Sequence, residues 1–201
     1  MAIYLPVGSL LYIDVHPKYN ANFEGYIPGY KVYYNGLLWK RKTGAASTKA
    51  QTPAVGSTFW ERSDEIDWVK LSEHNRQPLS LEHNRIEKSQ RMSNGTLRKF
   101  FIANKKNFST SWEMLPSFSN LTVDGGLGAV DLQEFYSSVG TNTFNIKIVY
   151  GQKIDEKVNR EEYYNVNFTS CSFSVIKRNV KGKTTNPAQE FWSASISMEQ
   201  V

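Results

Sequence analysis

The residues of this chain that most often do chemistry in proteins are few and lie far apart in the sequence. The three histidines are His16, His74 and His83, and the single cysteine is Cys171. No histidine has a Cys or His neighbour at the spacing that zinc sites use, and one thiol cannot form a disulfide within the chain. Because Cys171 lies in a run of strand-forming residues, we interpret it as a small buried hydrophobe and expect no metal site.

Two further patterns could carry chemistry, namely paired carboxylates and a glycine-rich loop. Solvated charge explains the pairs Asp64/Asp67 and Glu161/Glu162, although a glycosidase needs only two carboxylates at a set distance in a cleft. The segment 124–128 (Asp-Gly-Gly-Leu-Gly) precedes a predicted helix, but it has neither the Lys-Ser/Thr ending of a P-loop nor the spacing of a dinucleotide fingerprint. We therefore expect no enzyme activity and no cofactor.

The composition is typical of a folded protein that is rich in β-structure. Of the 201 residues, 40% are hydrophobic and 21% are charged, which favours a packed core over disorder. Aromatic residues make up 13% of the chain, and such side chains favour strands. The first residues lack the features of a secretory signal, and no apolar run has the length of a membrane helix. We therefore expect a protein that folds in the cytoplasm and has no membrane contact.

Positive charge is concentrated between residues 83 and 106, although the formal net charge is only +5. This segment could form solvated strand faces, or it could form a surface that meets a neighbouring subunit. DNA binding would predict a steep salt dependence, but the modest net charge does not require it, and we expect DNA contact to be incidental. The candidate interface residues are Arg85, Lys88, Arg91, Arg98 and Lys99.

The sequence divides into a first part, residues 1–75, rich in Tyr, Gly and Pro, and a second part, residues 78–201. The polar stretch Ser72–Pro78 between them is typical of a linker. In the second part, residues 84–92 and 96–102 flank a Ser-Asn-Gly sequence, which predicts a β-hairpin.

Alternating patterns predict further strands over residues 108–115, 144–150, 163–176 and 191–198. The apolar phase slips near Thr169, which predicts a β-bulge. Asp131 and Glu134 have capping-box spacing before a helix over residues 132–139. A short helix cannot connect several parallel strands. The fold class is therefore mainly β: an antiparallel two-sheet β-sandwich with one short helix, plus a small N-terminal module of three strands.

One linear pattern in the second part comprises the segments 85–92 (RIEKSQRM), 94–100 (NGTLRKF), 108–116 (FSTSWEMLP), 122–126 (TVDGG) and the ending 192–201. In this pattern the second part resembles tail proteins of long-tailed bacteriophages, of the tail-tube-like or minor tail type, over about two-thirds of the chain. The resemblance implies a non-enzymatic virion subunit of the tube, the minor tail or the distal tail that assembles into rings with copies of itself and with other tail proteins. A head or connector protein is the alternative within this class.

Such a subunit has to cover its exposed strand edges, and pairing with the next copy does so. Contacts that repeat from copy to copy and close on themselves give a ring. The polar segments 151–162 and 179–189 are candidate arms for this pairing, or simply mobile loops.

The first part contains a spaced pattern of aromatic residues and glycines: Tyr26, Gly29, Val32, Tyr34, Gly36 and Trp39, followed by Pro53 and Trp60. In this pattern it resembles small chitin-binding modules of carbohydrate-binding families five and twelve. The resemblance implies that exposed aromatic rings bind a polysaccharide of the host surface, because such rings stack on sugars. It also gives an alternative function for the chain, that of a carbohydrate-binding lectin. The same rings could instead form the core of so small a module. The candidate glycan-binding residues are Tyr33, Trp39, Trp60 and Trp68.

Overall fold

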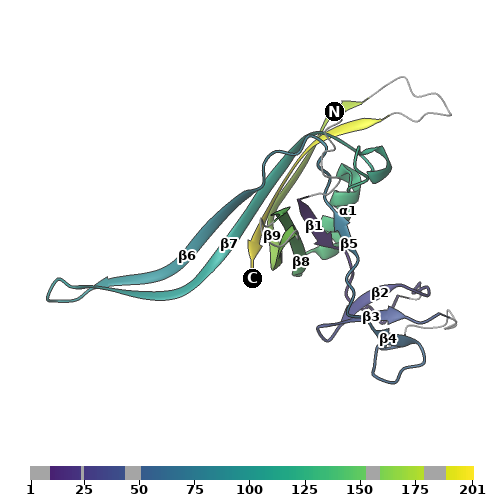
Figure 1. Ribbon diagram of the computed structural model, residues 1–201, viewed down its shortest axis with the longest axis horizontal. Helices are drawn as coiled ribbons and strands as arrows, with labels where there is room; N and C mark the ends of the chain where they lie inside the picture. Colours follow the sequence, from purple (N-terminus) through teal and green to yellow (C-terminus); the bar gives the residue numbers. More distant parts are fainter. Residues whose placement is uncertain (1–9, 24, 44–50, 153–158, 179–188) are drawn as a thin grey trace. The chain divides into compact units, whose positions relative to one another are not determined.

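The fold is mainly β, with one α-helix, a large antiparallel sheet of seven strands and a small sheet of three strands (Figure 1). The computed structural model describes residues 10–23, 25–43, 51–152, 159–178 and 189–201. The strands are β1 (Leu11–Asp14), β2 (Lys31–Tyr34), β3 (Leu37–Arg41), β4 (Trp60–Arg62), β5 (Trp68–Lys70), β6 (Ser80–Arg91), β7 (Leu97–Pro116), β8 (Phe144–Gln152), β9 (Asn159–Arg178) and β10 (Glu190–Gln200); the helices are η1 (Ser119–Leu121) and α1 (Ala129–Val139).

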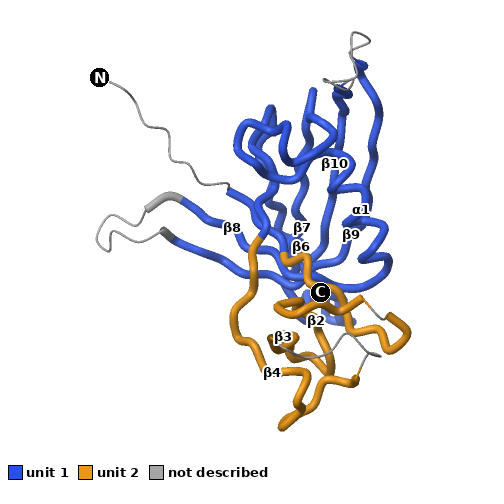
Figure 2. Tube along the Cα trace, turned by 90° about the vertical axis from the view of Figure 1, so that its right-hand side faces the viewer, with its two compact units in different colours: residues 1–13, 69–201 blue, residues 14–68 orange. Residues whose placement is uncertain are grey.

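The chain forms two compact units, a small one from Asp14 to Trp68 and a large one from the residues on either side (Figure 2). This division differs from the predicted one at residues 75–78. The strands that lead into and out of the small unit, β1 and β5, are neighbours in the large sheet, where Leu71 N donates to Leu11 O at 2.9 Å. The small unit is therefore an insertion between two paired strands.

The polar stretch after β5 is part of the large unit and not a linker. Ser72 is fully buried, and its hydroxyl donates to Asp124 Oδ1 at 2.9 Å. The indole of Trp112 donates to the carbonyl oxygen of Ser72 at 2.7 Å. Gly126 packs so closely on this segment that a Cβ atom there would lie 2.6 Å from the Ser72 Cα atom. The glycine-rich segment 124–128 thus allows two backbone segments to pack closely against each other.

The seven strands of the large unit follow the order β5-β1-β8-β9-β10-β7-β6 and form a sandwich because β9 belongs to both layers. Its first part, up to Val166, pairs with β8, and its second part, from Val166 on, pairs with β10. Across the layers, the rings of Phe108 and Tyr164 lie 5.0 Å apart. The buried core between the layers is formed by Leu11, Ile13, Ile146, Ile148 and Val166 on one side and Phe108, Trp112, Ala194, Ile196 and Met198 on the other.

Two bulges set which side chains face this core. Ser197 pairs with Ser170 and Met198 with Phe168, so Thr169 is the extra residue and the predicted bulge is confirmed. A second bulge lies in β7, where Trp192 pairs with Leu115 but Ala194 pairs with Trp112. Met114 has a positive φ of 59° there. Each bulge reverses the phase of the strand that follows it.

Helix α1 begins three residues before the predicted range, so the predicted capping pair Asp131/Glu134 is wrong: Gly128 is the N-cap, and Asp131 is the third residue of the helix. Asp131 Oδ2 accepts hydrogen bonds from Ser119 N at 2.7 Å and Gly128 N at 3.1 Å, so its carboxylate satisfies free backbone groups at the helix start. The ring of Phe135 meets those of Phe144 and Phe168 with centroids 5.2 and 6.0 Å apart, which seats the helix on the sandwich core.

Candidate assembly interface

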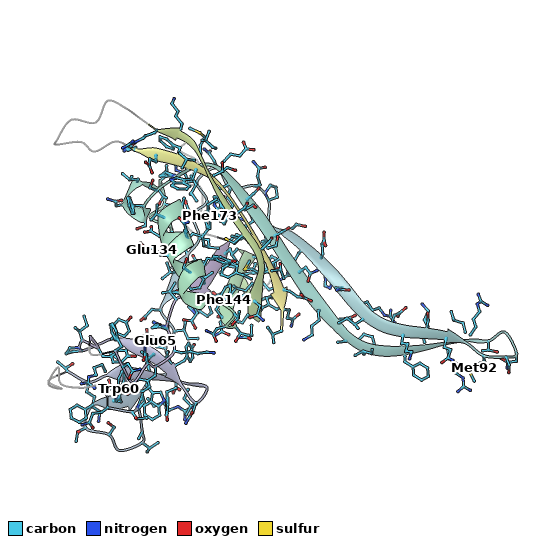
Figure 3. The ribbon with its side chains drawn as sticks, turned by 180° about the vertical axis from the view of Figure 1, so that it is seen from behind. Trp60, Glu65, Met92, Glu134, Phe144 and Phe173 are labelled. Atoms are coloured by element: carbon cyan, nitrogen blue, oxygen red, sulfur yellow. The ribbon has the colours of Figure 1, made fainter. Side chains whose placement is uncertain are left out.

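The hairpin of β6 and β7 continues beyond the sandwich as a two-stranded arm, residues 83–106. Within the described residues, β7 pairs with β10 only from Asn107 on, while β6 pairs with β7 as far as Arg91 and Leu97. The arm therefore has a free backbone edge on both sides. Figures 1 and 3 show it leaving the rest of the large unit, with Met92 near its far end.

The turn at the tip confirms the predicted hairpin, but its geometry differs from a two-residue Asn-Gly turn. Met92 N donates to Thr96 O at 2.9 Å, and Gly95 N donates to Met92 O at 2.9 Å. Gly95 has a φ of 82°, whereas Asn94 does not have a positive φ and accepts a hydrogen bond from Thr96 N at 3.1 Å. A three-residue loop that ends in a left-handed glycine fits this pattern.

The strand register gives the arm two faces of different charge. The pairs Glu87/Phe101 and Ser89/Lys99 lie on one side, here called the Glu87 face, together with Arg85. Glu87 lies 2.8 Å from Arg85 and 3.1 Å from Lys99, and the Arg85 guanidinium lies 5.6 Å from the Phe101 ring centroid. The cations of this face are therefore largely engaged within the arm.

The opposite side, here called the Phe100 face, carries the pairs Lys88/Phe100 and Gln90/Arg98. In the part of the chain that the structure describes, neither Lys88 nor Arg98 has a carboxylate partner. Ile86 also lies on this face, and its pairing with Ala103 is followed by a register shift that leaves Ile102 as an extra residue in β7.

The arm exposes large apolar side chains to solvent. Phe100 is 55% exposed, Phe101 57% and Ile102 65%. An exposed apolar cluster on a strand pair with two free edges is typical of a surface that another chain covers. The prediction of a strand over residues 96–102 is confirmed, whereas the exposure of this triplet is a finding of the structure. The sequence does carry a signal for that exposure, because the facing strand offers only Ile86 as an apolar partner within the arm.

Polar contacts fix the root of the arm to the other layer of the sandwich. Lys106 Nζ donates to the Tyr164 hydroxyl at 2.5 Å, and that hydroxyl donates to Glu162. Lys106 also lies 3.6 Å from Glu162 Oε2. The hydrogen bond with Tyr164 raises the pKa of Lys106, and the one from Tyr164 lowers the pKa of Glu162. These contacts therefore hold the root of the arm against the other layer of the sandwich.

All five basic residues proposed as interface candidates lie on the arm and are exposed. They divide between its faces: Arg85 and Lys99 lie on the Glu87 face, whereas Lys88 and Arg98 lie on the Phe100 face. Arg91 is paired with Leu97 near the tip and donates to Gly95 O at 3.3 Å. The two polar segments proposed as additional arms lie largely outside the described residues, which lack 153–158 and 179–188.

The small unit has the predicted three-stranded sheet, but it places the tryptophans in its core. Trp39 and Trp60 are 4% and 1% exposed and pack with Tyr26 and Val32. Of the two readings of these rings, core packing therefore fits the structure and a sugar-stacking surface does not. Figure 3 labels Trp60 within this unit.

The other two glycan candidates are half-buried. The Tyr33 hydroxyl donates to Asp14 Oδ2 at 2.6 Å, and Trp68 lies in β5. The four candidates thus do not form an exposed aromatic platform among the described residues.

His16 and Lys31 make structural contacts with Asp67 in the small unit. His16 Nε2 accepts a hydrogen bond from Asp67 N at 3.2 Å, and the buried Lys31 ammonium lies 2.8 Å from Asp67 Oδ1. Within the described ranges, no group of His, Cys, Asp and Glu is placed to hold a metal ion. The same residues include no helix of the length and hydropathy needed to cross a membrane.

Comparison with known proteins gives no match to a family model, to a curated protein or to a solved structure.

Proposed function

We propose that this protein is a non-enzymatic structural subunit of a bacteriophage virion, specifically of the tail, that self-associates through its arm. The observation that supports this function is a two-stranded arm that presents exposed aromatic and basic side chains. The resemblance of residues 85–126 and of the last strand to tail proteins supports the assignment to the virion. The role is one of assembly, so the partners are further copies of the chain and neighbouring tail proteins.

Such an arm is poorly stabilised by itself, which favours its being covered by another chain. An isolated pair of strands is marginally stable in water, because it has no sheet or helix to cover its faces. Burying the exposed part of Phe100, Phe101 or Ile102 would contribute about 1 kcal/mol for each side chain. A neighbouring copy that covers the arm would provide this burial and would also pair the free edges.

Removing the arm tests this function directly. The variant replaces residues 84–105 by Asn-Gly, which closes β6 and β7 with a short turn and leaves the sandwich core intact. We expect the wild type to form concentration-dependent oligomers in sedimentation velocity and rings or tubes in electron micrographs. The variant should remain monomeric with an unchanged sandwich by circular dichroism. Equal association of the two proteins would contradict the proposal.

The place of the protein in a particle needs a separate measurement. Antibodies raised against the chain, with gold labels, should mark the tails of purified virions. Labels on the head or at its junction with the tail would assign the chain to a head or connector role. Absence of the chain from purified particles would exclude a virion subunit.

A further inference from the structure

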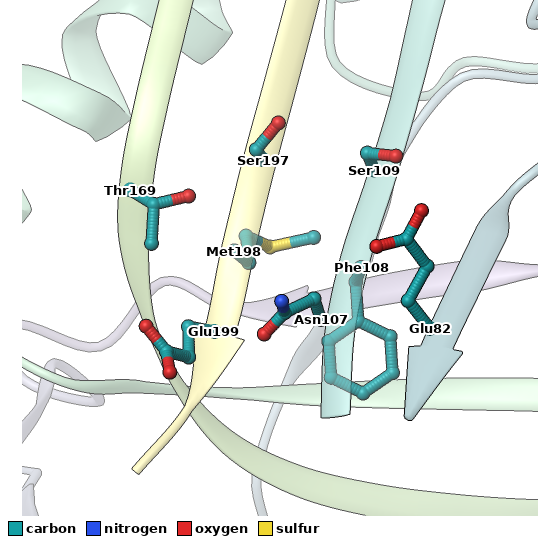
Figure 4. Close-up of a pocket in the computed structure, with 8 residues that line it drawn as sticks. All are labelled: Glu82, Asn107, Phe108, Ser109, Thr169, Ser197, Met198 and Glu199. Carbon is teal, nitrogen blue, oxygen red and sulfur yellow. The ribbon is translucent and has the colours of Figure 1, made fainter. Parts of the chain in front are cut away.

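The outer face of the sandwich has a hollow beside the root of the arm (Figure 4). Its volume is about 320 Å³. Neighbouring strands contribute its polar lining: Glu82 from β6, Asn107 and Ser109 from β7, Ser197 and Glu199 from β10, and Thr169 from the bulge of β9.

Hydrogen-bond acceptors dominate this hollow, and none of the described residues that line it is basic. Asn107 pairs in register with Glu82 on one side and with Glu199 on the other, so the three side chains form a row across three strands. The Oδ1 atom of Asn107 is buried and accepts no hydrogen bond from any residue that the structure describes. Within the described part of the chain, neither carboxylate forms an ion pair or accepts a hydrogen bond. The row therefore offers two negative charges and an amide oxygen to a donor-rich cation.

The arm carries the complementary groups on its Phe100 face. Arg98 and Lys88 lie there without a carboxylate partner among the described residues, whereas Lys99, on the opposite face, is held by Glu87. A guanidinium presents five N–H donors in a planar fork and suits a row of oxygen acceptors better than an ammonium does. Arg98 is therefore the group on the arm that fits the hollow best.

The arm of the same molecule does not reach this hollow. Arg98 pairs with Gln90, and the stretch of β6 from Glu82 to Gln90 spans roughly 26 Å at ~3.3 Å per residue. Since the two strands stay paired along this distance, an occupant from the arm has to come from a second copy.

We infer that the hollow between Glu82 and Glu199 receives Arg98 from the arm of a second copy of this chain. This inference rests on the proposed self-association and names the surface that accepts the arm. The Phe100 side chain would be covered by the same contact, because it shares a face with Arg98. The two halves of the contact are different surfaces, so each copy can give an arm and receive one.

Charge reversal tests both halves against a matched control. Arg98→Glu and Glu199→Lys should each lower the association constant at least tenfold, because each places like charges together in a covered site. Lys99→Glu changes the charge as Arg98→Glu does, but it lies on the Glu87 face, so we expect a change of less than threefold. Circular dichroism and thermal unfolding verify the fold, and Arg98→Gln and Glu199→Gln provide milder variants should a reversal fail to fold.

Combining the two reversals in one chain should restore association to within about threefold of the wild type. Mixing the two single variants should also restore association, with the two proteins alternating, because Arg98 of the Glu199→Lys protein meets the native Glu199 of the Arg98→Glu protein and the two reversed positions meet each other. If Glu199→Lys associates like the wild type while removal of the arm abolishes association, the hollow is not the receptor and the proposed function stands. If removal of the arm changes nothing, the proposed function fails as well.

Discussion

Cys171 illustrates how the position of one side chain in the fold determines its chemistry. It pairs with Ile196 in the sandwich, on the side of β9 that faces the core. Burial raises the pKa of its thiol to about 11. Because the thiolate is the reactive form, this environment suppresses the only thiol chemistry available to the chain.

We predict that iodoacetamide modifies Cys171 slowly in the folded protein at pH 8. A thiol with a pKa near 11 is about 0.1% ionised at that pH, against roughly a quarter for a free thiol, so the rate should be at least a hundredfold lower than in urea. Intact-mass measurements over time give both rates. Equal rates in native buffer and in urea would show that the thiol is exposed and reactive.

The tryptophans of the small unit show what residue types can and cannot predict. The pattern around Trp39 and Trp60 correctly indicates a short three-stranded sheet, and both rings are buried in it. The pattern could not decide between core and surface, because the same aromatic rings stack on sugars and fill small cores. Only the three-dimensional packing distinguishes the two uses.

The two bulges differ in how much of them the sequence reveals. At Thr169 the apolar positions change phase along one strand, so the bulge could be predicted. At Met114 the neighbouring Leu115 is also apolar, so the apolar alternation of the sequence runs through Met114 without a break. In the structure, however, Leu115 is the residue that is fully buried. A bulge between two apolar residues leaves no signal in the hydrophobic pattern.

Deleting Thr169 should therefore be tolerated, whereas deleting Ser172 should unfold the large unit. Without Thr169, the residues on either side of it become consecutive and keep their partners in β10, so the strand loses only its bulge. Without Ser172, Phe173 would turn to the opposite face and Ser174 to the core. We expect a loss of less than about 1 kcal/mol on the first deletion and of several kcal/mol on the second. Urea unfolding followed by circular dichroism measures both. Equal losses would show that the fold requires the bulge itself.

The arm allows a comparison of adjacent residues that point to opposite sides. Phe100 lies on the face with Arg98, while Phe101 stacks against Arg85 within its own arm. Phe100→Ser should lower the association constant roughly fivefold, because about 1 kcal/mol of apolar burial is lost. Phe101→Ser should change it less than threefold. Sedimentation equilibrium provides both constants, and a larger effect at Phe101 would assign the contact to the Glu87 face.

At the scale of the whole molecule, the sequence indicates two parts but places their boundary after the stretch 72–78. That stretch is polar and ends in proline, which is typical of linkers. In the fold, Ser72 and Glu73 bind Asp124, far along the chain, and are thereby held in the large unit. Partners so distant in sequence cannot be recognised from local composition, so the boundary could not be predicted from it.

The insertion of the small unit between β1 and β5 makes it removable. Leu11 and Leu71 are joined by a backbone hydrogen bond, so Ile13 and Val69 lie at the end of a strand pair that a two-residue Asn-Gly turn can close. The small unit has a buried cluster formed by its own residues, among them Trp39 and Trp60. We therefore expect two thermal transitions in the full chain and one after residues 14–68 are replaced by Asn-Gly.

The shortened protein should also keep its association constant within about twofold, since the arm and the hollow both belong to the large unit. Calorimetry resolves the transitions, and sedimentation equilibrium measures the association. A large loss of association with an intact sandwich would mean that the small unit forms part of the contact between copies. That result would assign the interface to both units instead of the large unit alone. In calorimetry, a single transition in the full chain would show that the two cores unfold together.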